Sequence, residues 1–162
     1  MDKIKEQILA LLENNGRLTY EELAALVGES VDTVKEIVKA LEKEGIICGY
    51  QALVNWDKTN DHDVSAVIEL KVTPQKGSGF DDIAEQIYRY PEVEALYLMS
   101  GSYDFLVILR KAPMKSIAKF VNQLAVLDDV VSTATHIVLV RYKDHNKILF
   151  QNKKDQRMVV SQ

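Results

Sequence analysis

Three lysines recur at every fourth position in the segment from residue 31 to residue 43. Lys35, Lys39 and Lys43 would lie along one side of an α-helix, because residues four apart are neighbours on a helix surface. Their ammonium groups could neutralise phosphates of a nucleic acid, although lysine lacks the planar fork with which arginine binds guanine. The alternative, that they only solvate the helix surface, stays open. The exposed candidates for nucleic-acid contact are Ser30, Asp32, Thr33, Lys35, Glu36, Lys39 and Lys43.

Other residue types that carry chemistry do not form a catalytic pattern. His62, His136 and His145 have no cysteine or serine motif nearby, and the sequence has no nucleophile elbow and no phosphate-binding loop. The acidic residues around His62, between positions 57 and 63, match no metal-binding spacing, and linker carboxylates are usually solvated. We therefore expect no enzymatic activity, no metal site and no cofactor.

The elements that would position the lysines are three helices, predicted by apolar residues at helical spacing. The first helix carries the stripe Ile4, Ile8, Leu11 and Leu12 and ends at Asn14-Asn15-Gly16. A short second helix begins at the capping-box pair Thr19 and Glu22 and ends at Gly28, in the left-handed conformation that glycine adopts readily. Ser30 caps a longer third helix, which Gly45 ends.

A short helix joined by a tight turn to a longer one is the helix-turn-helix layout, whose second helix lies in a DNA major groove. Residues 46–54, with Gly49 between two strand-like halves, predict the wing that follows it. The alternative is a three-helix unit that serves only for contacts between subunits. The charge does not favour a strong nucleic-acid binder: the chain is −4 overall, and residues 1–50 hold six Lys/Arg against ten Asp/Glu.

Collinear motifs in this region resemble the leucine-responsive regulator/AsnC family of prokaryotic transcription factors. They are the runs from Ile8 to Ala24 and from Val27 to Val34, and the segment from Leu41 to Asn55. The part from Glu44 to Asn55 is the most specific. The family usually carries an arginine cluster in the third helix where this chain has Glu36 and Ile37. This departure predicts a modest DNA affinity per subunit, which avidity from several subunits could offset.

After residue 63 the pattern changes to that of an α/β domain. Residues 55–63 are polar apart from Trp56, and we interpret them as a hinge. The predicted elements are a strand from Val64 to Pro74, a helix ended by Pro91, strands over Val93–Met99 and Phe105–Arg110, a helix over Met114–Leu127 and a strand over Val131–Tyr142. The order βαββαβ predicts a ferredoxin-like sandwich.

Both faces of the central strands are apolar, although helices cover only one face of such a sheet. Leu106 and Ile108 alternate with Phe105, Val107 and Leu109. At about 25 cal/mol per Å², leaving the second face in water would be costly, so we expect a second subunit to cover it. The alternative is that the C-terminal tail folds back over it.

The resemblance implies that this domain senses a ligand, and that its dimers associate into larger rings. It places an effector pocket, often for an amino acid, at the contact between dimers. On this basis Asp104 would accept from an ammonium group, while N–H groups near Gly101 and the hydroxyls of Thr133 and Thr135 would bind a carboxylate. The alternative is a tight hairpin with an Asx-type aspartate and β-favouring threonines. The implied effector residues are Gly101, Tyr103, Asp104, Thr133 and Thr135.

Together these observations predict an α+β protein: an N-terminal winged helix-turn-helix domain (1–54), a hinge (55–63), a ferredoxin-like effector-binding and oligomerisation domain (64–145) and a tail (146–162). The tail could be solvated, add an edge strand or contact DNA. The single Cys48, the mixed charge of the N-terminus and the lack of a long apolar run favour the cytoplasm and no membrane partner. The expected function is that of an amino-acid-responsive regulator binding double-stranded DNA. The alternative is an oligomeric metabolite-binding or adaptor protein with little operator binding.

Overall fold

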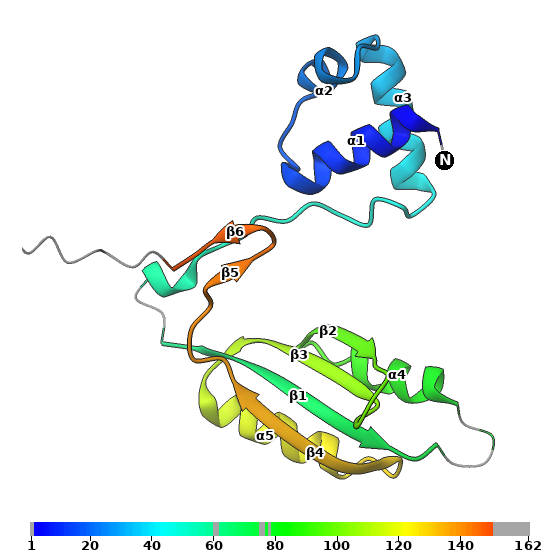
Figure 1. The fold of residues 1–162 in the computed structure, drawn as a ribbon. Helices are drawn as coiled ribbons and strands as arrows, with labels where there is room; N and C mark the ends of the chain where they lie inside the picture. The colour runs from blue at the N-terminus through cyan, green and yellow to red at the C-terminus, as the bar shows by residue number, and fades with distance from the viewer. Residues whose placement is uncertain (1, 60–61, 75–76, 78, 151–162) are drawn as a thin grey trace, which may run out of the picture. The chain divides into compact units, whose positions relative to one another are not determined.

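A computed structural model describes residues 2–59, 62–74, 77 and 79–150 of the chain. The chain divides into two compact units, Met1–Val54 and Asn55–Gln162 (Figure 1). Residues 151–162 of the predicted tail lie outside the described residues. None of the helices in the described ranges is long and apolar enough to cross a membrane.

The first unit consists of the three predicted helices, α1 (Lys3–Asn14), α2 (Tyr20–Val27) and α3 (Val31–Lys43). Its core is formed by apolar side chains from all three, which are almost completely buried. They are Ile8, Leu23, Ala24, Val34 and Val38. The helix-turn-helix layout is therefore confirmed.

The predicted caps fix where α2 and α3 begin. Thr19 Oγ1 accepts a hydrogen bond from the Glu22 N–H at 3.2 Å, and Glu22 Oε2 accepts one from the Thr19 N–H at 2.8 Å. Gly28 ends α2 with φ at 76°, a left-handed conformation that a side chain would make costly. Ser30 Oγ then accepts from the Thr33 N–H at 3.1 Å, so α3 starts directly after the glycine turn.

The segment after α3 differs from the prediction. Gly45 ends the helix with φ at 70°, but residues 46–54 contain no strand, so the prediction of strand-like halves around Gly49 was wrong. The segment instead packs through Tyr50, whose ring lies beside Gly16.

The second unit contains a four-stranded antiparallel sheet with order β2-β3-β1-β4. Its elements are β1 (Val64–Val72), α4 (Phe80–Tyr88), β2 (Val93–Leu98), β3 (Phe105–Ala112), α5 (Met114–Ala125) and β4 (Val130–Ile137). The predicted ferredoxin-like βαββαβ fold is confirmed. Figure 1 shows α4 and α5 on the same side of the sheet.

The core lies between the sheet and these two helices. Alternate residues of β1 and β3 point into it, including Ile68, Leu70, Phe105 and Val107, as the period of two predicted. The residues between them, such as Val67, Leu106 and Ile108, belong to the opposite face, which neither α4 nor α5 covers. We call this the uncovered face.

The last predicted strand is shorter than expected. β4 ends at Ile137 rather than Tyr142. It runs antiparallel to β1, so its last residues lie beside the first residues of β1. The Val138 N–H still donates to the Ser65 carbonyl at 2.9 Å, but β1 begins at Val64, and β4 has no strand to pair with beyond this point. The chain then forms a small hairpin of β5 (Lys143–Asp144) and β6 (Lys147–Ile148). The boundary predicted between residues 145 and 146 falls in its turn. A 3₁₀ helix, η1 (Trp56–Lys58), lies within the predicted hinge.

Candidate functional site

The outward side of α3 is the candidate nucleic-acid interface. Val34, Val38 and Leu41 turn inward and are buried, Ile37 packs half-buried beside them, and the polar positions of the helix lie toward solvent. The structure places every residue predicted for nucleic-acid contact at the α3 N-cap or on α3, and all are exposed. They are Ser30, Asp32, Thr33, Lys35, Glu36, Lys39 and Lys43.

The lysines of α3 are available for an external anion. Among the described residues, Lys35, Lys39 and Lys43 lie within ion-pair distance of no carboxylate. Residues at i, i+4 and i+8 share one side of a helix, so the three ammonium groups form a row. Asp32 and Glu36 stand on the same outward side and would repel a phosphate backbone. The helix therefore presents mixed charge along its length, and its last turn carries Glu42 as well as Lys43.

The hydroxyls at the start of α3 already make local hydrogen bonds. Ser30 Oγ lies 2.8 Å from Thr33 Oγ1 in addition to accepting the Thr33 N–H. Ser30 thus acts first as the helix cap. Any contact it makes with a ligand must use the hydrogen-bonding capacity that remains on the two hydroxyls.

Tyr50 is a residue of this unit that sequence reasoning did not single out. Its hydroxyl donates to Glu42 Oε1 at 2.9 Å, and this bond joins the segment after α3 to the last turns of α3. A Cβ on Gly16 would lie 3.2 Å from Tyr50 Cδ1, so the glycine leaves room for the ring. No local pattern signals this contact, because its partners come from three separate segments.

The environment of Tyr50 predicts a pH-dependent contact. Desolvation, followed by the hydrogen bond from the hydroxyl to Glu42, raises the pKa of Tyr50 from 10.0 to about 12. The folded state therefore favours the neutral phenol. The stabilisation is fully present below pH 10 and is lost as the pH rises through about 12. In an absorbance titration of tyrosinate, we expect a transition near pH 12 that belongs to Tyr50. Tyr50→Phe should remove this transition, and Tyr88→Phe, in the other unit, should retain it. A full set of transitions in Tyr50→Phe would contradict this account.

Asp104, predicted to bind an effector ammonium group, already has a role in the sheet. Its Oδ2 accepts a hydrogen bond from the Val72 N–H at 2.8 Å, and its own N–H donates to the Leu70 carbonyl at 2.8 Å. Its carbonyl accepts from the Met99 N–H at 2.7 Å. The residue thus joins the β2–β3 loop to the end of β1, and the loop includes Gly101, with φ at 129°, and Tyr103.

The other predicted effector residues lie at the same end of the sheet. Thr133 pairs with Leu70, which in turn pairs with Phe105, so β4, β1 and the start of β3 are in one row. Thr133 and Thr135 share the face of Leu70 and Ile68, on the helix side at the sheet edge. None of the five predicted residues lines the cavity beside α5 or the cavity between α4 and β2.

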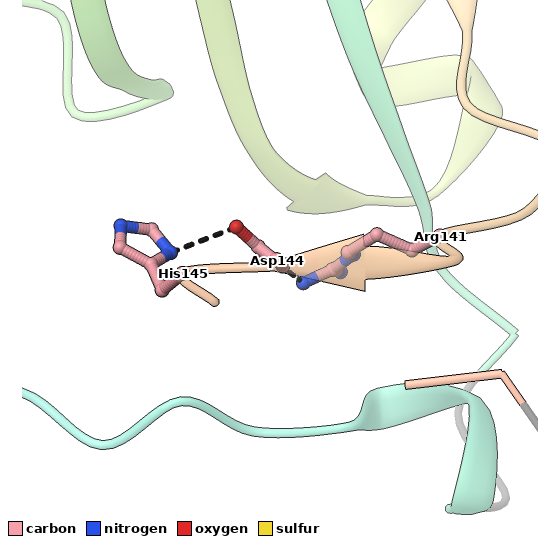
Figure 2. A network of polar contacts seen from close by, with 3 residues as sticks. All are labelled: Arg141, Asp144 and His145. Atoms are coloured by element: carbon pink, nitrogen blue, oxygen red, sulfur yellow. Dashed lines mark hydrogen bonds and ion pairs between the residues drawn. The ribbon is translucent and has the colours of Figure 1, made fainter. Parts of the chain in front are cut away.

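The β5–β6 hairpin holds a small polar network. Figure 2 shows Arg141 and His145 approaching Asp144: Arg141 Nη1 lies 3.3 Å from Asp144 Oδ2, and His145 Nδ1 lies 2.8 Å from Oδ1. Asn55 Nδ2 donates to the Leu149 carbonyl at 3.0 Å, which joins the hairpin to the start of the hinge. In the described ranges no three His, Cys, Asp or Glu residues come close enough together to hold a metal ion.

Comparisons with known proteins match both units. The profile of a winged helix-turn-helix DNA-binding domain matches residues 1–47, and that of the Lrp/AsnC ligand binding domain matches residues 65–148. The chain is 46% identical over 157 residues to YugG, an uncharacterised HTH-type transcriptional regulator of Bacillus subtilis, covering 96% of this chain and 95% of the relative. It is 31% identical to the leucine-responsive regulatory protein of Haemophilus influenzae, covering 93% and 91%.

Solved structures agree with these sequence matches. A transcriptional regulator of Neisseria meningitidis, crystallised in complex with L-Met, aligns with a TM-score of 0.71 at 29% identity, covering 89% of this chain and 93% of that chain. The leucine response regulatory protein of Mycobacterium tuberculosis aligns with a TM-score of 0.75 at 26% identity, covering 92% and 99%.

Proposed function

Because this chain belongs to the Lrp/AsnC family of transcriptional regulators, with a DNA-binding helix-turn-helix and a ligand-binding domain, we propose that it binds specific DNA sequences through α3 and that a small effector changes its DNA affinity or its assembly. The observation that carries the DNA part is the row of lysines on α3. They are exposed and have no carboxylate partner among the described residues. Phosphate neutralisation by such lysines provides affinity, and the neighbouring polar side chains contact bases.

A DNA titration at two salt concentrations tests the DNA part. We expect a site selected from a random-sequence pool to bind more tightly than unrelated DNA, with an affinity that falls steeply as salt rises. Equal affinity for both DNAs, with no salt dependence, would contradict the proposal.

The net charge of the first unit favours a second candidate function. The six Lys/Arg against ten Asp/Glu in residues 1–50 weaken the attraction for DNA. An oligomeric metabolite-binding or adaptor protein with little operator binding would tolerate this balance. Under that alternative, the α3 lysines could be replaced without effect on any activity of the protein.

We propose further that a second copy covers the uncovered face of the sheet, and that dimers associate into a larger oligomer. Leu106, Ile108 and Val67 form the apolar centre of this face, and Tyr97 beside them is 51% exposed. The β4 side is polar, with His136 Nε2 at 3.5 Å from Glu69 Oε1. An apolar centre with a polar margin is the usual composition of a subunit interface.

For the effector, the residues at the Asp104 end of the sheet favour an amino acid. Asp104 supplies negative charge for an ammonium group, and backbone N–H groups of the loop with the hydroxyls of Thr133 and Thr135 supply donors for a carboxylate. These groups line neither the cavity beside α5 nor the cavity between α4 and β2, and we infer that a neighbouring copy completes the site. The L-Met complex of the relative from Neisseria meningitidis supports this ligand class. The proposed effector residues are Gly101, Tyr103, Asp104, Thr133 and Thr135.

Asp104→Asn should abolish effector binding while keeping the fold. The amide oxygen can still accept from the Val72 N–H, so the link to β1 remains and only the negative charge is lost. In a thermal-shift panel of the twenty amino acids, we expect at least one to stabilise the intact protein and none to stabilise the variant. Asp81→Asn, an exposed carboxylate in the first turn of α4, is the matched control and should retain the shift. An unchanged ligand shift in Asp104→Asn would remove Asp104 from the site.

A further inference from the structure

The charges on the outward side of α3 follow an order along the helix. The positions that point away from the buried side lie on one line, at intervals of four, three and four residues. They are Asp32, Glu36, Lys39 and Lys43. The first two of these positions are acidic and the last two are basic, so the line changes sign near the middle of the helix. We call it the outward line of α3.

The two carboxylates of the outward line are free to accept hydrogen bonds. Asp32 and Glu36 are exposed, and their carboxylates form no hydrogen bond or ion pair with any described residue. Glu42, the third acidic residue of α3, differs from them. It follows the buried Val38 by one turn, off the outward line, and its Oε1 accepts from the Tyr50 hydroxyl at 2.9 Å. The acidic side chains that α3 offers to a ligand are therefore the two on the line.

The order of the charges matters because the two ends of a recognition helix meet different parts of DNA. The N-terminal residues of such a helix contact base edges in the major groove. In the binding mode proposed above, Asp32 and Glu36 lie in the half that meets bases, and Lys39 and Lys43 lie where they neutralise phosphates. At about 1.5 Å per residue, the two carboxylates are about 6 Å apart along the helix axis, which is comparable with two base-pair steps of about 3.4 Å each.

The four bases differ in what they offer a carboxylate in the major groove. An ionised carboxylate only accepts hydrogen bonds. Guanine presents the acceptors N7 and O6, thymine presents the acceptor O4 and a methyl group, and adenine presents the acceptor N7 beside its N6 amino group. Cytosine alone presents a donor, its N4 amino group, with no acceptor on its own edge. A carboxylate in the groove is therefore paired at cytosine, whereas at guanine it stays a buried, unpaired charge, which is costly.

We propose that Asp32 and Glu36 determine the base specificity of this protein by accepting hydrogen bonds from cytosine N4 amino groups and by excluding guanine. This specificity rests on the proposed binding of DNA through α3, and it adds the class of DNA site. Each carboxylate faces one cytosine, and the two cytosines lie within about two base pairs of each other. The acidic residues weaken the attraction for DNA in general, and they weaken it least at sites that supply these donors.

Selection from a random-sequence pool, followed by titration of single-base changes, tests this specificity in the full chain. We expect cytosine, and no guanine, at the positions whose base preference changes in Glu36→Gln or Asp32→Asn. Replacing such a cytosine by guanine should weaken binding at least about tenfold. N4-methylcytosine should weaken binding to a similar extent, because it still pairs with guanine but carries a methyl group in place of the major-groove donor.

Glu36→Gln separates base readout from the general effect of charge. The glutamine amide can accept from cytosine and also donate to guanine, so the ratio of the affinities for the cytosine and guanine sites should fall at least about fivefold. Glu13→Gln, which alters an exposed glutamate of α1, removes the same charge elsewhere in the unit. This control should keep the ratio of the unaltered protein, even where both affinities rise.

Three results would overturn the specificity while leaving DNA binding through α3 intact. They are a base other than cytosine at the positions that depend on Glu36 or Asp32, full affinity for the N4-methylcytosine site, and a ratio that Glu36→Gln and Glu13→Gln change alike. A protein that binds all DNA sequences equally would count against both proposals. The failure of base readout and the failure of specific DNA binding are therefore distinguishable in the same titrations.

Discussion

An aspartate in place of Ile108 should dissociate the protein into monomers. Ile108 lies at the centre of the uncovered face, between its strand partners Val67 on β1 and Ala95 on β2. A two-fold interface over this face would bury two new carboxylates, one from each copy, without partners. Such a buried, unpaired charge costs several kcal/mol, so the dimer dissociation constant should rise at least about a thousandfold. Light scattering at several protein concentrations measures the change in mass.

A control on the other side of the domain makes this result specific. Val126, the C-cap of α5, is 78% exposed, and Val126→Asp should leave the mass unchanged. If Ile108→Asp keeps the mass of the unaltered protein and remains folded, the face is not a subunit interface. The alternative that the segment 151–162 covers the face predicts a monomer already in the unaltered protein, and a chain ending at Phe150 would then begin to associate.

The structure shows which parts of this fold are encoded locally. The capping box of Thr19 and Glu22, the left-handed Gly28 and the period of two in β1 depend on residues close together in the sequence, and all were predicted. The fold could then be predicted from the order βαββαβ, because helices and strands of these lengths have few ways to cover one face of a sheet.

The features that were not predicted depend on partners distant in the sequence. The end of β4 is set by where β1 begins, about 70 residues earlier, so its own β-favouring residues could not indicate it. The segment after α3 is held by Tyr50 through Glu42 and Gly16 rather than by strand pairing.

The candidate sites follow the same division. The exposed face of α3 could be predicted because helical period alone determines it, and the structure places all of its predicted residues there. The proposed effector residues Asp104 and Thr133 were predicted by resemblance, and they reach one end of the sheet through strand pairing.

Replacing Lys35, Lys39 and Lys43 together by alanine should abolish most DNA binding. Each phosphate neutralised contributes about 0.9 to the slope of the logarithm of the binding constant against the logarithm of salt concentration. With three lysines in each of two copies, the slope should fall by up to about five, and the affinity near 0.1 M salt by at least about a hundredfold. Lys115→Ala with Lys119→Ala, two exposed lysines of α5, is the control for general loss of positive charge.

The acidic residues of α3 provide a test in the opposite direction. Glu36 lies on the same outward side as the lysines, so Glu36→Gln should strengthen binding and leave the salt slope nearly unchanged, because it removes a repulsion without adding a phosphate contact. A gain from Glu36→Gln together with a loss from the lysine variants would show that α3 itself faces the phosphates. If all variants bind alike, the DNA lies elsewhere on the protein or is not its partner, and the metabolite-binding alternative accounts better for the acidic first unit.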